Sequence, residues 1–146
     1  MANHKYLKEA GFDKEAWGDT LPKNDRRRPE WTKERRIYGF DERETWSLKD
    51  DSLYWLYEHI KMYMEVSDVN LNYHKFDVDG EEMTQSQILN EILKKIKIYY
   101  NINNCFYSEY GEGLVGLSSS DLWVMQPEIA KKIWHLWGIV FPAMWW

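Results

Sequence analysis

Apolar residues recur at steps of three and four near the middle of the chain, which predicts a helix over residues 50–66. Such steps place side chains on one stripe of a helix with 3.6 residues per turn. Ser47 precedes this stripe, and Asp50 lies three residues after Ser47, the spacing of a capping box that satisfies free amides of the first turn. Asp51 is the alternative cap. The stripe consists of Leu53, Leu56, Tyr57, Ile60, Tyr63 and Met64.

A second stripe predicts a helix over roughly residues 85–101. Thr84 and Gln87 form another capping box ahead of it. Between the two helices, Phe76 and Val78 alternate with polar residues, and Asp79-Gly80 suits a tight turn with positive φ. A small β-hairpin or an extended loop fits this segment. The second stripe consists of Ile88, Ile92, Leu93, Ile96 and Tyr99 or Tyr100.

Residues 102–120 are predicted to form a loop, since they contain three glycines, several asparagines and a serine triplet. Pro127 then suits the first turn of a third helix, because that position needs no amide donor. Pro142 is expected to kink or end this helix. Its apolar face consists of Ile129, Ile133, Leu136, Trp137 and Val140.

Residues 1–45 show neither a sustained helical nor a strand period. Short helices are expected over Lys5–Ala10 and near Glu30–Arg36. Large aromatic residues are spaced like anchors for an irregular arm: Phe12, Trp17, Trp31 and Phe40. The sequence therefore predicts a mainly α protein, in which an aromatic arm of residues 1–45 is packed on, or swapped from, a helical domain of residues 46–146. That domain is expected to be a small bundle of three amphipathic helices with a short hairpin.

The charge is unevenly distributed. The chain has 146 residues, a net charge of −5 and 16% aromatic residues. From Pro22 to Arg43, eight Lys or Arg stand against five Asp or Glu, whereas from Glu44 to the end eight Lys stand against fifteen acids. A basic arm therefore precedes an acidic body. The arm either attracts the body or meets phosphates or an acidic protein surface.

No motif for catalysis or metal binding is evident. The four histidines have no metal-ligand spacing, and Cys105 is the only cysteine. Asp77-Val78-Asp79-Gly80 lacks the other ligand positions of a calcium loop. We therefore expect no enzyme activity, no cofactor and no metal. The N-terminus has no signal core, and the apolar stretch from Ile133 to Trp146 is too short to span a bilayer, so we expect a soluble protein in a reducing compartment.

The candidate partner-binding surface lies in the arginine-rich region. All six arginines fall between Arg26 and Arg43, with aromatic rings among them. Guanidinium groups recognise carboxylates and phosphates through a planar fork and stack on rings. The candidate residues are Arg26, Arg27, Arg28, Trp31, Arg35, Arg36, Arg43, Glu44 and Trp46.

The segment from Glu34 to Leu48, ERRIYGFDERETWSL, resembles a family of small uncharacterised phage and prophage proteins. In these proteins a Gly-aromatic pair, an acidic stretch and Trp-Ser open a long helix. The resemblance continues through residues 54–63 and to the aromatic C-terminus. This chain has Lys49 where the family commonly has Asp. The resemblance implies a phage-encoded protein that acts in an infected bacterium, and it carries no activity to transfer.

On this basis Gly39 is expected to turn the backbone. Phe40 and Trp46 are expected to anchor the arm to the helix of residues 50–66, with the acids of residues 41–44 near its N-terminal end.

Three functions are consistent with these features. The first is a non-enzymatic accessory protein in the bacterial host cytoplasm that inhibits a host system, such as an anti-CRISPR or other anti-defence inhibitor. Its partner would be a host protein, namely a defence effector or its nucleic-acid complex. The second is a virion or assembly protein that self-associates through its arm. The third is a nucleic-acid-binding protein that uses the arginines.

Overall fold

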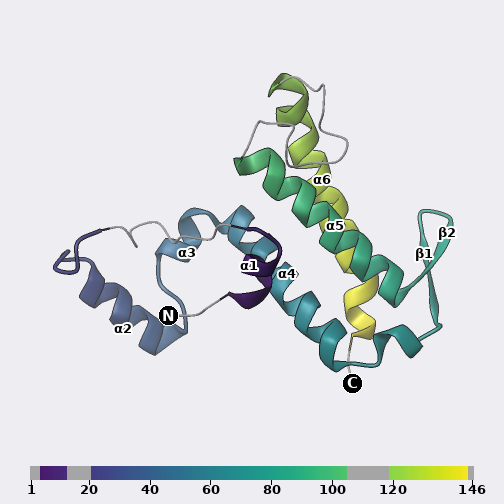
Figure 1. The fold of residues 1–146 in the computed structure, drawn as a ribbon, viewed down its shortest axis with the longest axis horizontal. Coiled ribbons are helices and arrows are strands. Elements are labelled where there is room, and N and C mark those ends of the chain that lie inside the picture. Colours follow the sequence, from purple (N-terminus) through teal and green to yellow (C-terminus); the bar gives the residue numbers. More distant parts are fainter. Residues whose placement is uncertain (1–3, 13–20, 105–118, 145–146) are drawn as a thin grey trace. The chain divides into compact units, whose positions relative to one another are not determined.

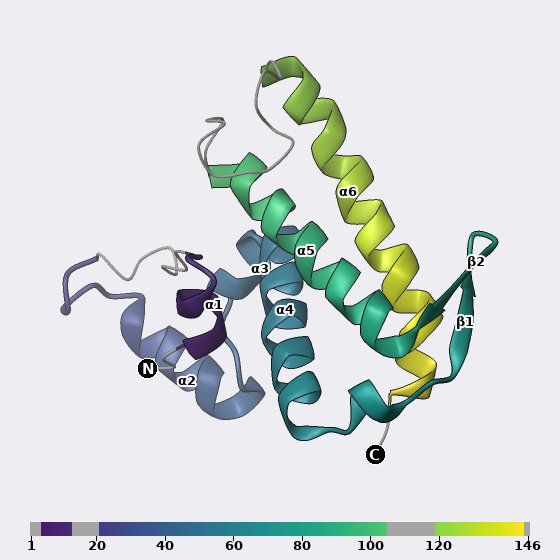
Figure 2. The ribbon, with the colours of Figure 1, turned by 45° about the vertical axis from the view of Figure 1, so that its right-hand side comes forward.

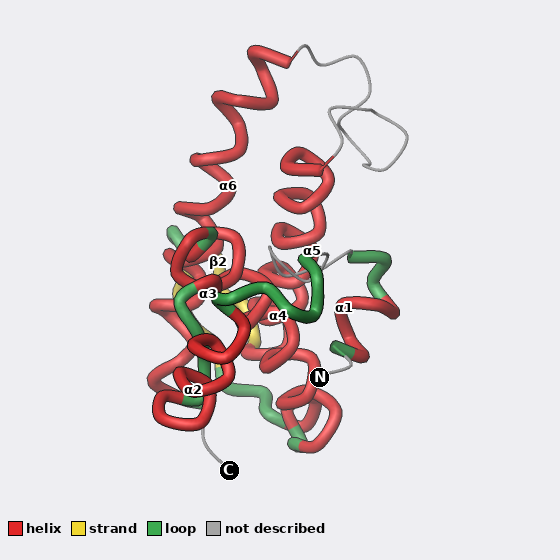
Figure 3. The backbone as a smooth tube through the Cα atoms, turned by 90° about the vertical axis from the view of Figure 1, so that its left-hand side faces the viewer, coloured by secondary structure: helices red, strands yellow, loops and turns green. Residues whose placement is uncertain are grey.

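The computed structural model describes residues 4–12, 21–104 and 119–144. These residues form a mainly helical fold with one two-stranded antiparallel hairpin, as predicted (Figure 3). The chain divides into two compact units, Met1–Leu56 and Tyr57–Trp146, which we call unit 1 and unit 2. The predicted division between an arm of residues 1–45 and a domain of residues 46–146 stays a prediction.

Unit 1 contains three short helices and the start of a long one (Figure 1). Its helices are α1 (Lys5–Glu9), α2 (Arg28–Tyr38), α3 (Arg43–Trp46) and the first part of α4 (Leu48–Val66). The two short helices expected in the arm are thus confirmed, whereas α3 was not predicted. Phe12 packs on Tyr54, with the ring centroids 6.0 Å apart. The buried apolar residues of unit 1 are Tyr6, Leu7, Phe12, Trp31, Leu53, Tyr54 and Leu56.

Gly39 ends α2 and turns the backbone, as expected. Its φ of +86° is left-handed, a conformation that glycine adopts without the steric cost a side chain would add. Its amide donates to the carbonyl of Arg35 at 3.0 Å, which closes the last turn of the helix.

Helix α4 begins at Leu48 and confirms the predicted helix of residues 50–66. The carbonyl of Ser47 accepts hydrogen bonds from the amides of Asp50 and Asp51 at 3.0 and 2.9 Å. The side-chain bonds of the predicted capping box at Ser47 stay a prediction. A short 3₁₀ helix, η1 (Val69–Leu71), follows α4.

The predicted hairpin is present. Strands β1 (Lys75–Val78) and β2 (Glu81–Thr84) pair antiparallel, with Phe76 opposite Met83. Asp79 and Gly80 form the two-residue turn with φ values of 54° and 90°. Two positive φ angles are what a tight hairpin turn requires, so the Asp-Gly pair has the predicted role.

Helix α5 (Gln85–Asn104) begins with the predicted capping box. The amide of Thr84 donates to Gln87 Oε1 at 2.8 Å, and the amide of Gln87 donates to Thr84 Oγ1 at 3.3 Å. These reciprocal bonds satisfy two amides that the first turn leaves without helical partners. The sequence therefore predicted both the start and the type of this element correctly.

Helix α6 (Ser119–Val140) lies along α5 (Figures 1 and 2). It begins eight residues before Pro127, so the prediction that Pro127 lies in the first turn is wrong. The buried Leu122 packs with Ile102, and Ile98 and Met125 join them, so apolar contact with α5 extends α6 towards its N-terminus. The predicted end near Pro142 is confirmed, because η3 (Phe141–Ala143) follows Val140.

The core of unit 2 is aliphatic and lies mainly on α5 and α6. Its largest fully buried side chains on these helices are Tyr99, Ile88, Leu89, Ile92, Ile96, Ile102, Ile133 and Leu136. The predicted loop of residues 102–120 is shortened at both ends by helix, and its residues 105–118 lie outside the described residues, as does Trp17. Among the described helices, none combines the length and apolar character that a membrane crossing requires.

Candidate interaction surface

Asp41 organises the junction between α2 and α3, which we call the corner (residues 25–46). The Asp41 side chain is buried, with 1% of the residue's surface exposed. Its Oδ2 accepts hydrogen bonds from Arg35 Nε and Arg43 Nη2, both at 2.8 Å. Its Oδ1 accepts from the backbone amide and the Nε of Arg43, at 3.1 and 2.9 Å. One carboxylate thus joins two arginines and the first turn of α3.

The environment of Asp41 favours its charged form. Burial alone raises the pKa of the carboxyl group. The hydrogen bonds from the side chain and backbone of Arg43, together with the charges of Arg35 and Arg43, outweigh burial and hold the pKa of Asp41 below its usual value. The corner is therefore stabilised by an ionised, fully bonded carboxylate.

Trp31 forms the apolar centre of the corner and is 2% exposed. The guanidinium of Arg43 lies 4.3 Å from the ring centroid, close enough for a cation–π interaction. The indole Nε1 donates to Glu42 Oε1 at 2.9 Å. Trp46 meets Trp31 edge-on, with the centroids 6.3 Å apart and the planes at 77°. The Trp31 ring is therefore held in place by three directional contacts, from Arg43, Glu42 and Trp46.

The N-terminal side of α2 is held by Arg27 and Arg28. Arg27 donates from its Nε to Asp25 Oδ1 and from its Nη2 to Asp25 Oδ2, each at 3.1 Å. The side-chain hydrogen bond from Arg27 is the main cause that lowers the pKa of Asp25 to about 2. Arg28 Nε donates to the carbonyl of Pro22 at 2.8 Å, and its Nη2 donates to the carbonyl of Leu21. Both side chains thus bind atoms of unit 1.

The candidate residues therefore separate into three groups, of which Arg27 and Arg28 form the first. The corner brings together Trp31, Arg35, Arg43, Glu44 and Trp46, since Arg35 Nη2 also donates to Glu44 Oε1 at 2.7 Å. Arg26 and Arg36 are exposed, and neither forms an ion pair with a residue in the described part of the chain. The sequence could not separate these groups, because all the arginines lie within one short region.

The acidic residues of the corner bond within it: Asp41 and Glu44 bind arginines and Glu42 binds an indole. Their expected placement near the N-terminal end of the long helix stays a prediction. Phe40 packs on Tyr38, with 6.3 Å between the ring centroids. The expected anchoring of Phe40 on the long helix stays a prediction. Two aromatic residues, Tyr38 and Phe40, thus contact each other at the end of α2.

Three large apolar side chains protrude there, and we call them the aromatic edge: Ile37, Tyr38 and Phe40. Their exposed fractions are 59%, 65% and 48%. Aromatic side chains and arginine are enriched among the residues that dominate the energy of protein–protein binding. Phe40 was predicted only as an anchor of the arm, and none of the three belongs to the predicted partner-binding residues.

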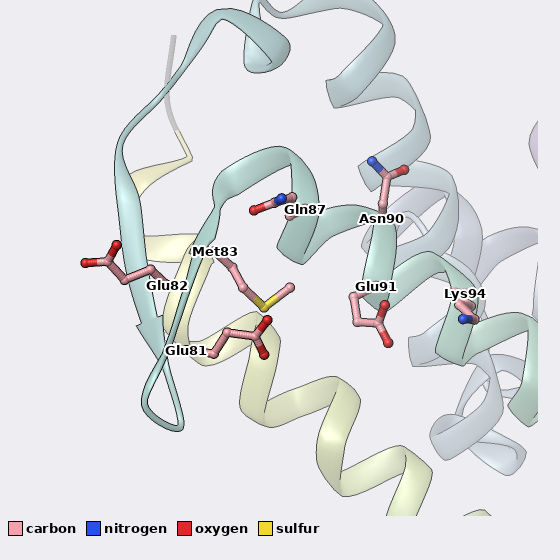
Figure 4. Close-up of a pocket in the computed structure, with 7 residues that line it drawn as sticks. All are labelled: Glu81, Glu82, Met83, Gln87, Asn90, Glu91 and Lys94. Atoms are coloured by element: carbon pink, nitrogen blue, oxygen red, sulfur yellow. The ribbon is translucent and has the colours of Figure 1, made fainter.

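Unit 2 presents a shallow pocket of about 400 Å³ between β2 and α5 (Figure 4). Met83 and Glu81 of β2 point into it, opposite Glu91 of α5. Lys95 Nζ lies 3.3 Å from Glu91 Oε1. The complete lining is Glu81, Glu82, Met83, Gln87, Asn90, Glu91 and Lys94.

The turn of the hairpin is tied to α6. Asp79 Oδ2 accepts from Lys132 Nζ at 2.7 Å, and Asp79 Oδ1 lies 2.9 Å from His135 Nε2. The hydrogen bond from Lys132, followed by that from His135, lowers the pKa of Asp79. Among the described residues, no three His, Cys, Asp or Glu side chains form a group that could hold a metal ion.

Comparisons of the chain with protein-family models, with curated proteins and with solved structures found no match.

Proposed function

We propose that this chain is a non-enzymatic, phage-encoded accessory protein that binds and inhibits a host system by direct contact, as anti-CRISPR and other anti-defence inhibitors do. The observation that carries the proposal is the aromatic edge, which protrudes from a junction fixed by Asp41. The phage setting rests on the resemblance of residues 34–48.

A fixed support favours tight binding because ordering a surface costs free energy on association. Holding a side chain that was free before binding costs about 0.5–1.5 kcal/mol. Gly39 ends α2 between Tyr38 and Phe40, and Asp41 is anchored next to them. The backbone under the aromatic edge is therefore positioned before a partner arrives.

The bonding of the arginines supports a protein partner over nucleic acid. Arg27, Arg35 and Arg43 each bond to carboxylates of unit 1, which reduces their capacity to neutralise phosphates. The aromatic edge offers apolar area, which phosphate recognition does not use. A host defence effector, alone or with its nucleic acid, fits these features as the target.

We place the inhibitor in the host cytoplasm, where such effectors act. We also infer that α4, α5 and α6 form the three-helix bundle that the sequence predicts. Burial of Tyr57 and Ile60 on α4, together with the bond from Gln85 Nε2 to Tyr63 Oη at 3.2 Å, supports this arrangement.

The proposal is tested by expressing the chain in a bacterium whose defence system blocks a phage, and by capturing its partner from the same cells. We expect the wild-type protein to restore plaque formation and to capture a defence component. Tyr38→Ala/Phe40→Ala should weaken capture at least about tenfold, as loss of central aromatic contacts usually does. Tyr73→Ala is the matched control, because Tyr73 is 78% exposed and lies in unit 2.

Full inhibition by the double variant would contradict the assignment of the aromatic edge. Recovery of the chain as a component of purified phage particles would instead support the virion alternative.

A further inference from the structure

We propose that two copies of this chain pair through the outer edge of β1, so that their two hairpins form one antiparallel sheet. The inference goes beyond the proposed function, since it concerns a different surface and a second copy of this chain. It rests on the backbone groups and the charge pattern of residues 75–77.

The outer edge of β1 has no neighbouring strand among the described residues. The sheet consists of β1 and β2 alone, and β1 lies on the outer side of the hairpin (Figures 2 and 4). Residues that flank a two-residue turn exchange hydrogen bonds, and such pairs alternate along the strands, so Val78 and Phe76 bond towards β2. The amides and carbonyls of Lys75 and Asp77 therefore point outwards, where they can receive another strand.

One antiparallel register satisfies all these outward groups. When Phe76 of one copy lies opposite Phe76 of the other, Lys75 of each copy lies opposite Asp77 of the other copy. Both residues of such a pair have outward amides and carbonyls, so each pair exchanges two backbone hydrogen bonds. The two copies are then related by a two-fold axis that passes through the Phe76 pair.

The same register places opposite charges side by side. Lys75 and Asp77 are exposed, and neither forms an ion pair with a residue in the described part of the chain. Asp77 Oδ1 accepts a hydrogen bond from the amide of Gly80 at 2.9 Å, which leaves Oδ2 available. Cross-strand pairs of opposite charge stabilise a sheet, and the two-fold axis forms this pair twice.

Asp77 lies beside a second carboxylate within its own hairpin. Its cross-strand partner is Glu82, which is also exposed and points away from the pocket (Figure 4). Like charges directly opposite each other destabilise a strand pair. In the proposed sheet, Lys75 of the second copy lies on the other side of Asp77 and offsets this repulsion.

Charge also disfavours the neighbouring registers. A shift of two residues in one direction places Lys75 opposite Lys75, and a shift in the other direction places Asp77 opposite Asp77. Lysine on an edge strand commonly prevents unwanted pairing. In β1, the combination of Lys75 with Asp77 favours one register over its neighbours.

The contact involves a strand of four residues in each copy, so it is small. Small interfaces belong to weak and transient complexes, and we expect a dissociation constant above about 1 µM. Because the two-fold contact occupies the outer edge of β1 in both copies, association should stop at the dimer.

The test is sedimentation velocity of the purified full-length protein from about 1 to about 500 µM, a range that covers weak association. Wild-type protein should form dimers and nothing larger. Lys75→Asp and Asp77→Lys should each raise the dissociation constant at least about tenfold, because both cross-strand pairs become repulsive.

Two controls carry the same charge changes outside the hairpin of unit 2: Lys97→Asp and Asp68→Lys. Both positions are exposed, and both variants should dimerise as the wild type does. Loss of dimers in the controls would show that overall charge, and not the edge of β1, governs association. Thermal melting followed by circular dichroism checks that every variant is folded.

Mixing the two defective variants is the decisive experiment. Lys75→Asp has acids at both positions and Asp77→Lys has lysines at both, so each repels itself while the mixture should form dimers of one copy each. The double variant Lys75→Asp/Asp77→Lys exchanges the charges and should dimerise within about threefold of the wild type. Both results would also exclude loss of the Gly80 hydrogen bond as the cause of the defect in Asp77→Lys.

Wild-type protein that stays monomeric up to about 500 µM overturns the proposal, since even weak specific pairing is populated there. A mixture of the two variants that stays monomeric also overturns it. Capture of a host protein through Tyr38 and Phe40 is measured separately, so failure here is distinguishable from failure of the proposed function.

Discussion

The corner of unit 1 and the α5–α6 pair of unit 2 are held by different kinds of contact. In unit 2 the α5–α6 pair buries aliphatic side chains such as Ile92, Ile96 and Ile133. In the corner of unit 1 the central contacts are a buried carboxylate, Asp41, and a ring that stacks with Arg43. Aliphatic burial depends on area, whereas the corner depends on direction and charge.

This difference shows how a small protein can support an exposed apolar surface. Apolar burial is non-directional and does not by itself fix the position of one loop. A carboxylate with four hydrogen bonds from two arginines permits little movement, so it fixes the backbone next to Phe40. We infer that the polar corner holds the aromatic edge in position and that the packed helices α5 and α6 supply stability.

The largest expected effect is in the aliphatic pair. Ile92→Ala removes a fully buried side chain of α5 and leaves a cavity, which should lower the free energy of unfolding by about 4 kcal/mol. Urea denaturation followed by circular dichroism measures this loss. Lys97→Ala on the exposed side of the same helix should change the free energy by less than about 0.5 kcal/mol. Equal losses in both variants would show that burial of Ile92 is not the reason for the loss.

A smaller effect is expected at Asp41. Asp41→Asn keeps the shape but removes the charge, so the largely buried guanidinium of Arg43 loses its ion pair with Asp41. We expect a loss of about 2 kcal/mol in denaturation followed by tryptophan fluorescence. Glu44→Gln is the control, because its ion pair with Arg35 is solvent-exposed and worth less than about 1 kcal/mol. If the control were as damaging as Asp41→Asn, burial would not be the reason.

The smallest effect is expected when the pH is lowered. Comparing the melting temperatures of wild type and Asp41→Asn separates the contribution of Asp41 from that of the other acids. The folded pKa of Asp41 lies below its unfolded value, so its contribution is present above about pH 4 and is lost as the pH falls through the folded pKa. Asp25, with a pKa lowered to about 2, loses its contribution in the same direction. The difference in melting temperature between wild type and Asp41→Asn should therefore narrow on acidification towards about pH 2.

Asp25 titrates in both proteins, and so does Asp79, whose pKa is also lowered. Their effects cancel in the comparison. A difference that stays constant down to about pH 2 would show that the charge of Asp41 does not stabilise the corner.

The parts of the fold that follow from local signals could be predicted from the sequence. The Thr84–Gln87 box, the Asp79-Gly80 turn and the Gly39 helix end each depend on a few neighbouring residues. The start of α6 could not be predicted in this way. A proline in a helix interior costs about 3 kcal/mol locally, but burial of Leu122 against Ile102 of α5 favours the longer helix.

The sequence predicted where the candidate surface lies in the chain, but it did not predict which arginines bond to acids and which are exposed. The cluster of arginines indicated the α2 region, yet Arg26, Arg27 and Arg28 have three different environments. Which arginine bonds to an acid depends on the helix face and on the position of Asp41, and neither is encoded in spacing alone. Reversing the charge of all three would therefore combine one change at the surface with two changes in the bonding of unit 1.

The hairpin turn has a further consequence for how this protein can be altered. Asp79 adopts a left-handed backbone that disfavours a side chain, and that same side chain bridges to Lys132 and His135. Removing it as Asp79→Gly would relieve the backbone while releasing the turn from α6. Relief of the backbone stabilises the fold and loss of the contacts with Lys132 and His135 destabilises it. The free energy of unfolding can therefore stay unchanged while amide exchange in β1 and β2 accelerates. Evolution can thereby loosen one end of unit 2 without lowering its melting temperature.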